Sequence, residues 1–147
     1  GPEVSRVQRA ALRHPHNIEL LPPGGQEDVA ARLREATVFV TAPVAQRRWN
    51  EQYGLAYLEA MASGLPIVTT ITGTNHEAVR PPNIRTRHDS RDLEQALLYL
   101  IDNPAEASRI GAYNRRLAIS DFDLDTQCRR MGEVFDTVEA RTDAAPG

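Results

Sequence analysis

The chain has 147 residues, 41% of them hydrophobic and 25% charged, which is typical of one globular domain with its own core and excludes wholesale disorder. Its formal net charge of −3 argues against a nucleic-acid-binding protein. All 17 basic residues are arginine, which excludes a lysine nucleophile, and the single cysteine, Cys128, excludes an internal disulfide and fits a reducing compartment.

The first third of the chain predicts alternating helices and strands. Apolar residues at helical spacing predict a helix over residues 3–14, which Pro15 ends. NIELL (17–21) predicts a short strand, and after a Pro-Pro-Gly-Gly turn QEDVAARLREA (26–36) predicts a helix with acids in its first turn. TVFVT (37–41) is β-branched, aromatic and almost wholly apolar, which predicts a strand covered on both faces.

The middle of the chain is organised around EQYGLAYLEAMASGLPIVTT (51–70). A loop over residues 42–53 leads to a helix that starts at Gly54, and Pro66 to Thr70 predict an apolar strand after a Gly-Pro break. We expect the helix to carry Glu59 at the border of a buried stripe made of Leu55, Leu58, Met61 and Ala62. Residues 73–79 predict a loop that enters a short helix, and residues 83–87 a weak edge strand.

The last third of the chain predicts helices only. Ser90 is the expected N-cap of a helix over residues 91–101, and Pro104 suits the first turn of a helix that runs to about Ile119. A last helix over residues 121–139 is expected to turn five side chains inward: Cys128, Met131, Val134, Phe135 and Val138. Residues 142–147 are expected to form a flexible tail.

These patterns predict an α/β, Rossmann-like domain over residues 1–141, with a small parallel sheet of at most four strands between two layers of helices. Because the pattern opens on a helix, we expect the first β-α-β portion of a larger protein to be absent; a small complete α/β domain is the alternative. Neither a signal-peptide pattern nor an apolar run of 18 residues is found, so we expect a cytoplasmic protein.

A helix start at Gly54 would bring two carboxylates and a row of free backbone amides to one rim of the sheet. Glu51 then lies in the loop, and Glu59 about a turn and a half into the helix leans back toward the rim. The amides of Tyr53, Gly54 and Leu55 suit a phosphate, and carboxylates suit adjacent sugar hydroxyls. Together they describe a site for a nucleotide sugar. The alternative is a solvated loop acid at Glu51 and a capped, structural acid at Glu59.

Several motifs, in order, closely resemble one family. EQYGLAYLE (51–59), with its Glu-x7-Glu pair, LEAMASGLPIVTT (58–70) and GTNHEAV (73–79) resemble the donor-binding half of retaining glycosyltransferases of the GT-B fold, often called family 4 or group 1. The likeness runs from about residue 17 to 139 and includes TVFVTAP (37–43) and DSRDLEQALLYLIDNP (89–104). It implies the Rossmann-like, three-layer C-terminal half of a GT-B fold, which ends in closing helices and lacks its first β-α-β portion.

The resemblance also implies a role for each matched residue. Glu51, the catalytic candidate, matches the acid at the donor sugar and its departing phosphate, and Glu59 matches the acid that holds the ribose hydroxyls. Residues 21–24 correspond to a region near the base. The other substrate-binding candidates are positions that meet the diphosphate or the sugar: Tyr53, Gly54, Leu55, Gly73, Thr74 and Asn75. His76 is a weaker candidate, explained at least as well as an exposed loop histidine.

The implied reaction is transfer of a sugar from a nucleoside diphosphate sugar, a UDP- or GDP-sugar, to an acceptor hydroxyl with the anomeric configuration retained. The implied partners are that donor and an N-terminal acceptor-binding domain that is missing from the chain. No cofactor and no metal are expected, and the histidines show no metal-ligand spacing. Membrane association occurs in the family, but no basic amphipathic helix here demands it.

Departures from the family pattern bear on activity. Val44 follows Pro43 where the family commonly has serine, and Thr74 follows Gly73 where a second glycine is common, which affects the loop at the sugar. The basic pair that neutralises the leaving diphosphate in the family has no counterpart here. We therefore expect the isolated fragment to be inactive.

Two alternative functions remain open. The chain could be part of a GT-B sugar-nucleotide epimerase or a glycan phosphorylase, which would share the donor half. It could also be a noncatalytic binding or interaction module, because a fold does not guarantee an activity.

Overall fold

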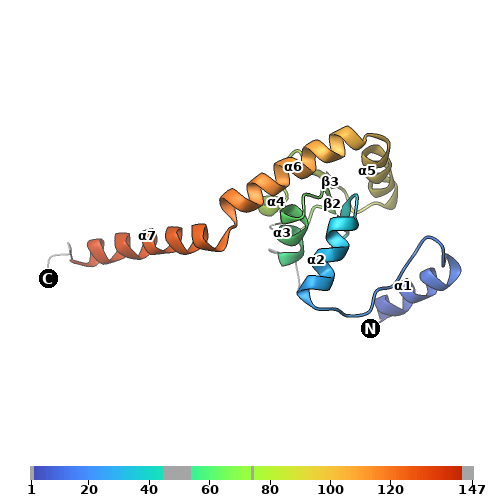
Figure 1. The fold of residues 1–147 in the computed structure, drawn as a ribbon, viewed down its shortest axis with the longest axis horizontal. Helices are drawn as coiled ribbons and strands as arrows, with labels where there is room; N and C mark the ends of the chain where they lie inside the picture. The colour runs from blue at the N-terminus through green and yellow to red at the C-terminus, as the bar shows by residue number, and fades with distance from the viewer. Residues whose placement is uncertain (1, 45–53, 74, 144–147) are drawn as a thin grey trace.

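The computed structural model describes residues 2–44, 54–73 and 75–143, and Figure 1 shows how their helices and strands are arranged. Three strands form one parallel sheet in the order β1-β2-β3, which confirms the predicted α/β class with a small parallel sheet. The elements are α1 (Pro2–Arg13), α2 (Gln26–Glu35), β1 (Phe39–Thr41), α3 (Leu55–Ala62), β2 (Ile67–Thr70), α4 (Asn75–Ala78), β3 (Ile84–Thr86), α5 (Ser90–Asp102), α6 (Pro104–Asp121) and α7 (Leu124–Asp143).

Parallel pairing brings the carboxyl ends of the three strands to one edge of the sheet. Thr41 of β1 lies in register with Thr69 of β2, and Thr70 of β2 lies in register with Thr86 of β3. The helices that follow β1 and β2 along the chain are α3 and α4, so both begin at this carboxyl edge. The carboxyl edge is where open α/β sheets bind ligands.

Helices cover both faces of the sheet, as the predicted three-layer arrangement requires. Successive strand residues point to opposite faces, and in β2 Ile67 belongs to one core cluster while Val68 belongs to the other. The first cluster contains residues of α3 and α4 together with Ala118 of α6, and the second contains residues of α5 and of the first half of α6. All four residues of β2 are buried, so β2 is the central strand.

The turn between α3 and β2 lies against α6. Gly64 has a left-handed backbone (φ +76°), and the amides of Gly64 and Leu65 donate to the carbonyls of Met61 and Ala60, which ends α3 in a Schellman motif. A Cβ atom on Gly111 of α6 would lie 2.0 Å from the Gly64 carbonyl oxygen. The predicted Gly-Pro break is confirmed, and the two glycines let α6 touch the turn backbone to backbone.

Two buried asparagines, Asn83 and Asn114, link α6 by hydrogen bonds to the amino ends of β2 and β3. The side-chain amides of Asn83 and Asn114 exchange hydrogen bonds of 2.7 and 2.8 Å. Asn114 also donates to the Leu65 carbonyl at 2.7 Å. Asn83 accepts from the Ile67 amide at 2.9 Å and donates to the Arg80 carbonyl at 3.0 Å. Because all the amide protons of this pair have acceptors, the network fixes the position of α6 without leaving a buried donor unsatisfied.

Two predictions about the first strands are wrong. Residues 17–21 form no strand, and Leu20 and Leu21 are 47% and 48% exposed. A short apolar segment becomes a strand only where a neighbouring strand completes its hydrogen bonds, and none of the described strands lies beside it. β1 covers only Phe39–Thr41, and Val40 is 43% exposed because β1 has a single neighbour among the described strands.

α3 buries a different stripe from the predicted one. Leu55 is 74% exposed and Ala62 is exposed, whereas Tyr57 and Ala60 are buried together with the predicted Met61. Glu59 is exposed rather than at the border of a buried stripe. The helix is turned toward Tyr57 because the tyrosine hydroxyl finds partners on the strands, as described below.

The helices α5 and α6 confirm the predicted spans, but the cap of α5 is Asp89 and not Ser90. The Asp89 carboxylate accepts hydrogen bonds from the amides of Arg91 and Asp92, at 2.8 and 3.3 Å. A carboxylate is a good N-cap because it accepts from free first-turn amides at the positive end of the helix dipole. Ser90 is instead the first helical residue.

The prediction of an inward face on α7 is wrong. Met131, Val134 and Phe135 are each 61% exposed, Val138 is 55% exposed, and Cys128 is exposed. Figure 1 shows α7 extending away from the sheet, so its apolar spacing does not report burial. The helix ends at Asp143, and residues 144–147 lie outside the described part of the chain. No helix in the described ranges is long and apolar enough to cross a membrane.

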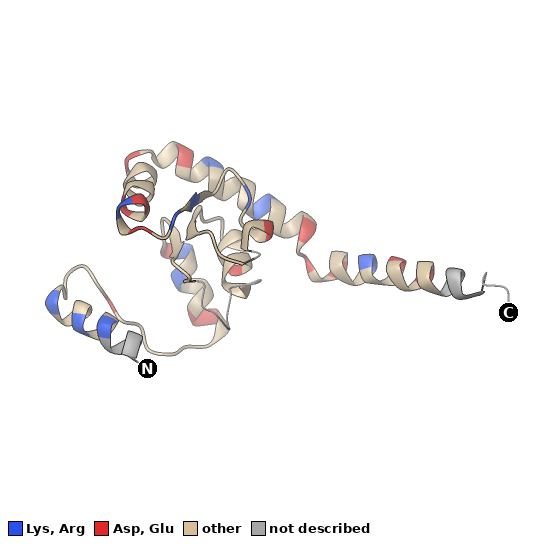
Figure 2. Cartoon of the chain, turned by 180° about the vertical axis from the view of Figure 1, so that it is seen from behind, with Lys and Arg blue, Asp and Glu red and all other residues tan. Residues whose placement is uncertain are grey.

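Charged residues of both signs are interspersed along the described chain, as the colours of Figure 2 show. A local exception is α1, where Arg6, Arg9 and Arg13 share one face because they are three and four residues apart.

Candidate functional site

α3 begins at the carboxyl edge without a local cap. Its N-cap residue Gly54 (φ −71°, ψ 121°) has no side chain that could accept a hydrogen bond, and the first turn holds no acidic residue. The Tyr57 amide donates to the Gly54 carbonyl at 3.0 Å and closes the turn. Helix geometry leaves the amides of Gly54, Leu55 and Ala56 without intrahelical acceptors. Such a turn, at the positive end of a helix dipole, suits an anion.

Three hydroxyls fasten this turn to the sheet, and we call them the hydroxyl triangle (Thr41, Tyr57 and Thr69). The Tyr57 Oη lies 3.0 Å from Thr41 Oγ1 and 3.1 Å from Thr69 Oγ1, and the two threonine oxygens lie 2.9 Å apart. Tyr57 is only 2% exposed, and its ring meets that of Phe39 edge-on, with centroids 6.2 Å apart. The triangle therefore joins α3 to the ends of β1 and β2.

The loop between β2 and α4 is also held by polar contacts at the carboxyl edge. The Thr70 hydroxyl donates to the Pro43 carbonyl at 2.7 Å, which ties the end of β2 to the residues that follow β1. The fully buried Asn75 side chain donates to the Thr70 carbonyl at 2.7 Å and accepts from the Thr72 amide at 3.3 Å. Gly73 has a left-handed backbone (φ +50°) and is exposed. Asn75 thus shapes the loop, while Gly73 lies at its surface.

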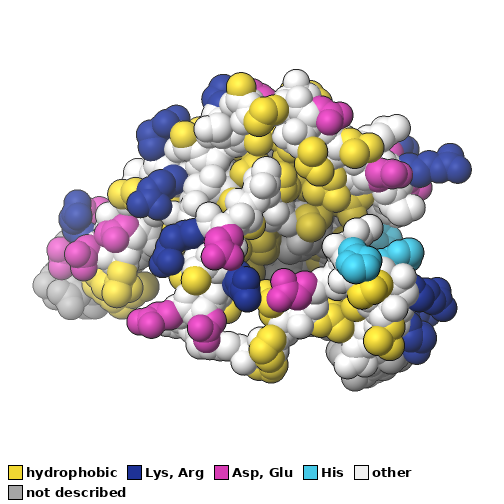
Figure 3. All heavy atoms as spheres, turned by 45° about the vertical axis from the view of Figure 1, so that its right-hand side comes forward, with side chains coloured by type: hydrophobic (Ala, Val, Ile, Leu, Met, Phe, Trp, Pro, Cys, Tyr) yellow, Lys and Arg dark blue, Asp and Glu magenta, His cyan; other side chains and the backbone are white. Residues whose placement is uncertain are grey.

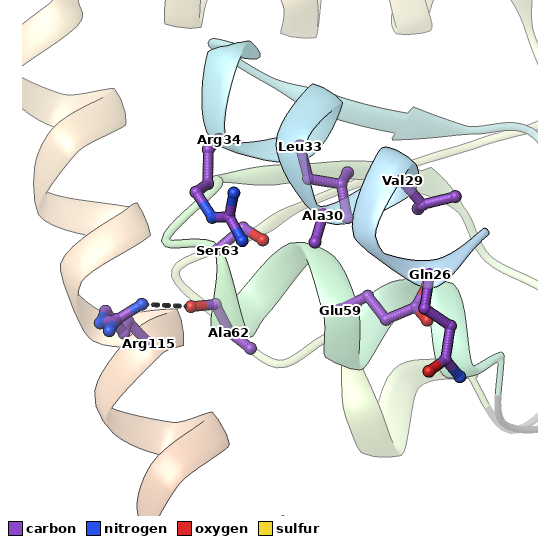
Figure 4. Close-up of a pocket in the computed structure, with 9 residues that line it drawn as sticks. All are labelled: Gln26, Val29, Ala30, Leu33, Arg34, Glu59, Ala62, Ser63 and Arg115. Atoms are coloured by element: carbon purple, nitrogen blue, oxygen red, sulfur yellow. Dashed lines mark hydrogen bonds between the residues drawn. The ribbon is translucent and has the colours of Figure 1, made fainter. Parts of the chain in front are cut away.

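Glu59 lies in a groove between α2 and α3, shown in Figure 4. The cavity has a volume of about 510 Å³ and is lined by Gln26, Val29, Ala30, Leu33, Arg34, Glu59, Ala62, Ser63 and Arg115. Glu59 points toward Gln26, the first residue of α2, while Arg34 and Arg115 lie at the other end of the groove. Within the described residues the Glu59 carboxylate has no hydrogen-bond partner, so its oxygens are available to a ligand.

Arg115 has a different role from Glu59, because its guanidinium donates to the Ala62 carbonyl at the end of α3. α3 has no basic residue in its own last turn. A cation from α6 therefore satisfies a terminal carbonyl of α3 and complements the negative end of its dipole.

Residues 21–24 border a second hollow, beside α2. Its volume is about 840 Å³, and it is lined by Leu21, Pro22, Pro23, Gly24 and six residues of α2 with Ala36. The space-filling view shows a hollow with a largely hydrophobic inner wall and with charged and histidine side chains along part of its rim (Figure 3). At the start of α2 the Gly25 amide is satisfied by the Asp28 carboxylate at 2.9 Å.

The structure brings together part of the predicted site. Gly54, Leu55 and Glu59 lie on or beside the first turns of α3, Gly73 lies in the loop after β2, and Asn75 is the first residue of α4. Glu51, Tyr53 and Thr74 lie outside the described residues. His76 is exposed. In the described ranges no group of three or more His, Cys, Asp or Glu side chains could hold a metal ion.

Two residues of this region were missed in the sequence. Tyr57 carries no local signal for this contact, because its partners lie 12 and 16 residues away in the chain. Gln26 was read only as the start of a helix, and nothing local indicates that it faces Glu59. The one available signal was the group of threonines at the ends of two predicted strands.

Comparison with known proteins places these motifs in a family. The family model described as "Glycosyl transferases group 1" matches residues 1–117. The MMP alpha-(1->4)-mannosyltransferase of Mycolicibacterium hassiacum is 32% identical over 122 residues, which cover 80% of this chain and 28% of that protein. The D-inositol 3-phosphate glycosyltransferase of Streptomyces avermitilis is 31% identical over 137 residues, which cover 91% of this chain and 28% of that protein.

A third relative is named for its donor. It is the GDP-mannose-dependent monoacylated alpha-(1-6)-phosphatidylinositol monomannoside mannosyltransferase of Corynebacterium glutamicum, 25% identical over 140 residues, which cover 92% of this chain and 36% of that protein. The chain thus spans between about a quarter and two fifths of the length of these curated relatives.

Proposed function

The chain belongs to the group 1 glycosyltransferases, and on that premise we propose that it binds the nucleotide-sugar donor of a retaining glycosyltransferase. The parent enzyme moves a sugar from a UDP- or GDP-sugar to an acceptor hydroxyl. The observation that carries this proposal is the start of α3 at the carboxyl edge, which has no side-chain cap, and the Glu59 carboxylate little more than a turn further along the same helix, which has no partner among the described residues.

The diphosphate of the donor occupies the positive end of α3. The free amides of Gly54, Leu55 and Ala56 donate to phosphate oxygens, and the absence of acidic residues in this turn avoids repulsion. A left-handed, exposed Gly73 lets the backbone of the neighbouring loop approach a ligand closely. The diphosphate therefore meets backbone groups rather than long side chains.

The ribose lies against Glu59, between α3 and the start of α2. A carboxylate can accept two hydrogen bonds from vicinal hydroxyls, and Gln26 opposite adds an amide that can donate or accept. The base then extends toward residues 21–24, where Leu21 and the two prolines offer an apolar surface. Leucine and proline select for a flat apolar ring but not for one base over another, so both UDP and GDP are tested below.

The transferred sugar faces Glu51 and the loop that contains Thr74 and Asn75. Glu51 acts at the sugar and the departing phosphate, and Tyr53 adds a backbone amide beside those of Gly54 and Leu55. These roles rest on the family resemblance. Asn75 contributes by shaping the loop, because both ends of its side-chain amide already bind backbone groups.

The reaction itself needs a second half that supplies the acceptor groove and a basic pair for the leaving diphosphate. Catalysis in such an enzyme relies on positioning between two domains and on electrostatic stabilisation of the leaving group. The 147-residue chain alone therefore binds donor nucleotide but transfers no sugar, and it does so without a metal or other cofactor. Measurable sugar transfer by the purified chain would contradict the predicted inactivity.

Calorimetric titration of the chain with UDP and with GDP tests the donor site. We expect one of the two nucleotides to bind and to raise the melting temperature, because it binds only the folded state. Glu59→Gln should weaken binding about tenfold, the effect of losing charge-assisted hydrogen bonds to the ribose. The control is Glu94→Gln, an exposed glutamate on α5, which should bind as the wild type does. The proposal fails if neither nucleotide binds, or if both variants bind alike.

A further inference from the structure

We propose that the hydroxyl triangle is a positioning element of the donor site, and that it holds the first turn of α3 at the angle needed for its free amides to face the diphosphate. The inference rests on the proposed function. It assigns a role to three residues that make no contact in the nucleotide groove: Thr41, Tyr57 and Thr69.

Tyr57 links the first turn of α3 to the ends of β1 and β2. Its amide closes the first turn by donating to the Gly54 carbonyl at 3.0 Å. Its hydroxyl, at the other end of the side chain, lies 3.0 and 3.1 Å from the hydroxyls of Thr41 and Thr69. A shift of the turn therefore moves Tyr57, and the two strand ends oppose that shift.

Among the described residues, no local side-chain interaction stabilises the first turn of α3, so the turn depends on a tertiary contact. Most helix starts are stabilised by a side-chain cap or by acids in the first turn. α3 has neither, since Gly54 caps it and its first turn contains no acid. A cap would occupy the very amides that a phosphate needs. A tertiary contact at the third helical residue stabilises the turn while leaving those amides free.

The Tyr57 hydroxyl adds directional hydrogen bonds to the apolar packing that the Tyr57 ring already makes. The ring of Tyr57 packs against Phe39 and is nearly fully buried, and phenylalanine would fill the same space. The three hydroxyls lie within hydrogen-bond distance of one another, and the Thr69 hydroxyl also donates to the Thr70 carbonyl at 3.4 Å. Hydrogen bonds depend strongly on geometry, so the closed triangle restricts rotation and sliding of α3 more than apolar packing does.

Two pairs of variants separate positioning from simple stability. Tyr57→Phe removes one hydroxyl and keeps the ring, and Thr41→Val removes another with little change of shape, whereas Thr41→Ser keeps the hydroxyl. The control is Ile110→Val in the second core cluster, which contains no residue of α3 and where the change should cost similar stability. Each variant is measured for nucleotide affinity by calorimetry and for exchange of the α3 amides by NMR.

We expect Tyr57→Phe and Thr41→Val each to weaken nucleotide binding by about five- to tenfold, the effect of one lost hydrogen bond on the alignment of the site. Exchange of the Tyr57 amide should quicken in both variants. Thr41→Ser and Ile110→Val should bind within about twofold of the wild type. If Tyr57→Phe binds as the wild type does, or loses no more affinity than Ile110→Val, the positioning role is refuted.

Amide exchange tests the hold on α3 independently of nucleotide binding, so failure of this inference can be told apart from failure of the proposed function. If the wild-type chain binds neither nucleotide, the proposed function fails. In that case faster exchange at Tyr57 in Tyr57→Phe, but not in Ile110→Val, still supports the hold on α3, and unchanged exchange refutes it.

Discussion

Replacing Gly111 by alanine tests how α6 is joined to the turn after α3. Alanine is the better helix former, and in an exposed helix the change would stabilise by about 1 kcal/mol. Here the new Cβ would lie 2.0 Å from the Gly64 carbonyl oxygen, a backbone atom that cannot swing aside. α6 would have to retreat, and Asn114, one turn further along, would move away from Asn83 and the Leu65 carbonyl.

We expect a net loss of about 2 kcal/mol or more in the free energy of unfolding, because overpacking costs typically exceed the gain in helix propensity when the neighbour is rigid. Urea unfolding followed by circular dichroism should show the midpoint falling by about 1 M, given ordinary m-values. The matched control is Gly132→Ala on α7, where a new Cβ would meet nothing within 4 Å. An unchanged or raised midpoint for Gly111→Ala would refute the backbone contact.

The remaining predictions concern single contacts. Asn114→Leu should cost about 3 kcal/mol in urea unfolding, because it leaves one buried amide proton of Asn83 and the Leu65 carbonyl without a partner; a loss below about 1 kcal/mol would contradict the network. Asp89→Ala should lower stability by about 1 kcal/mol through loss of the α5 cap, and Asp89→Asn should recover most of it. The pKa of Glu106 lies below its usual value because Arg109 donates two hydrogen bonds to it, at 2.7 Å each. Any stability from this pair is present above the unfolded-state pKa and is lost as the pH falls through the folded-state pKa. NMR titration should show Arg109→Gln raising the pKa of Glu106, and an unchanged pKa would refute the pairing.

The sequence predicts the core elements well where a signal is local. The strand after the Gly-Pro break, the helices from Gln26 and Pro104 and the short edge strand all carry composition or turn residues that act within a few positions. Residues 17–21 have the composition of a strand, but a strand also needs a hydrogen-bonded neighbour, and that information lies elsewhere in the chain. The prediction that α7 turns an apolar face inward was wrong for a related reason. Periodicity shows that a helix has an apolar face, but not what covers that face.

The rotation of α3 about its axis could not be predicted, because it depends on hydrogen bonds between Tyr57 and residues far away in the sequence. Counting apolar residues favours burying Leu55, whereas the structure exposes it and buries Tyr57. The difference lies in Thr41 and Thr69, which offer hydroxyls to the tyrosine from two strands. The same rotation carries Glu59 out of the core and into the groove beside α2, so a polar contact between strands and helix decides where the predicted ribose-binding acid points.

The two edges of the sheet differ in how completely their polar groups are satisfied, and this difference favours the carboxyl edge as the site. At the amino edge Asn83 and Asn114 have partners for all their amide protons, and Gly111 packs directly on backbone. At the carboxyl edge, within the described ranges, the buried hydroxyls of Thr72 and Thr86 have no partner, and the start of α3 has no cap. Natural proteins satisfy most buried polar groups, so exceptions that gather at one edge need a cause. Binding of a ligand with many oxygens at that edge supplies such a cause.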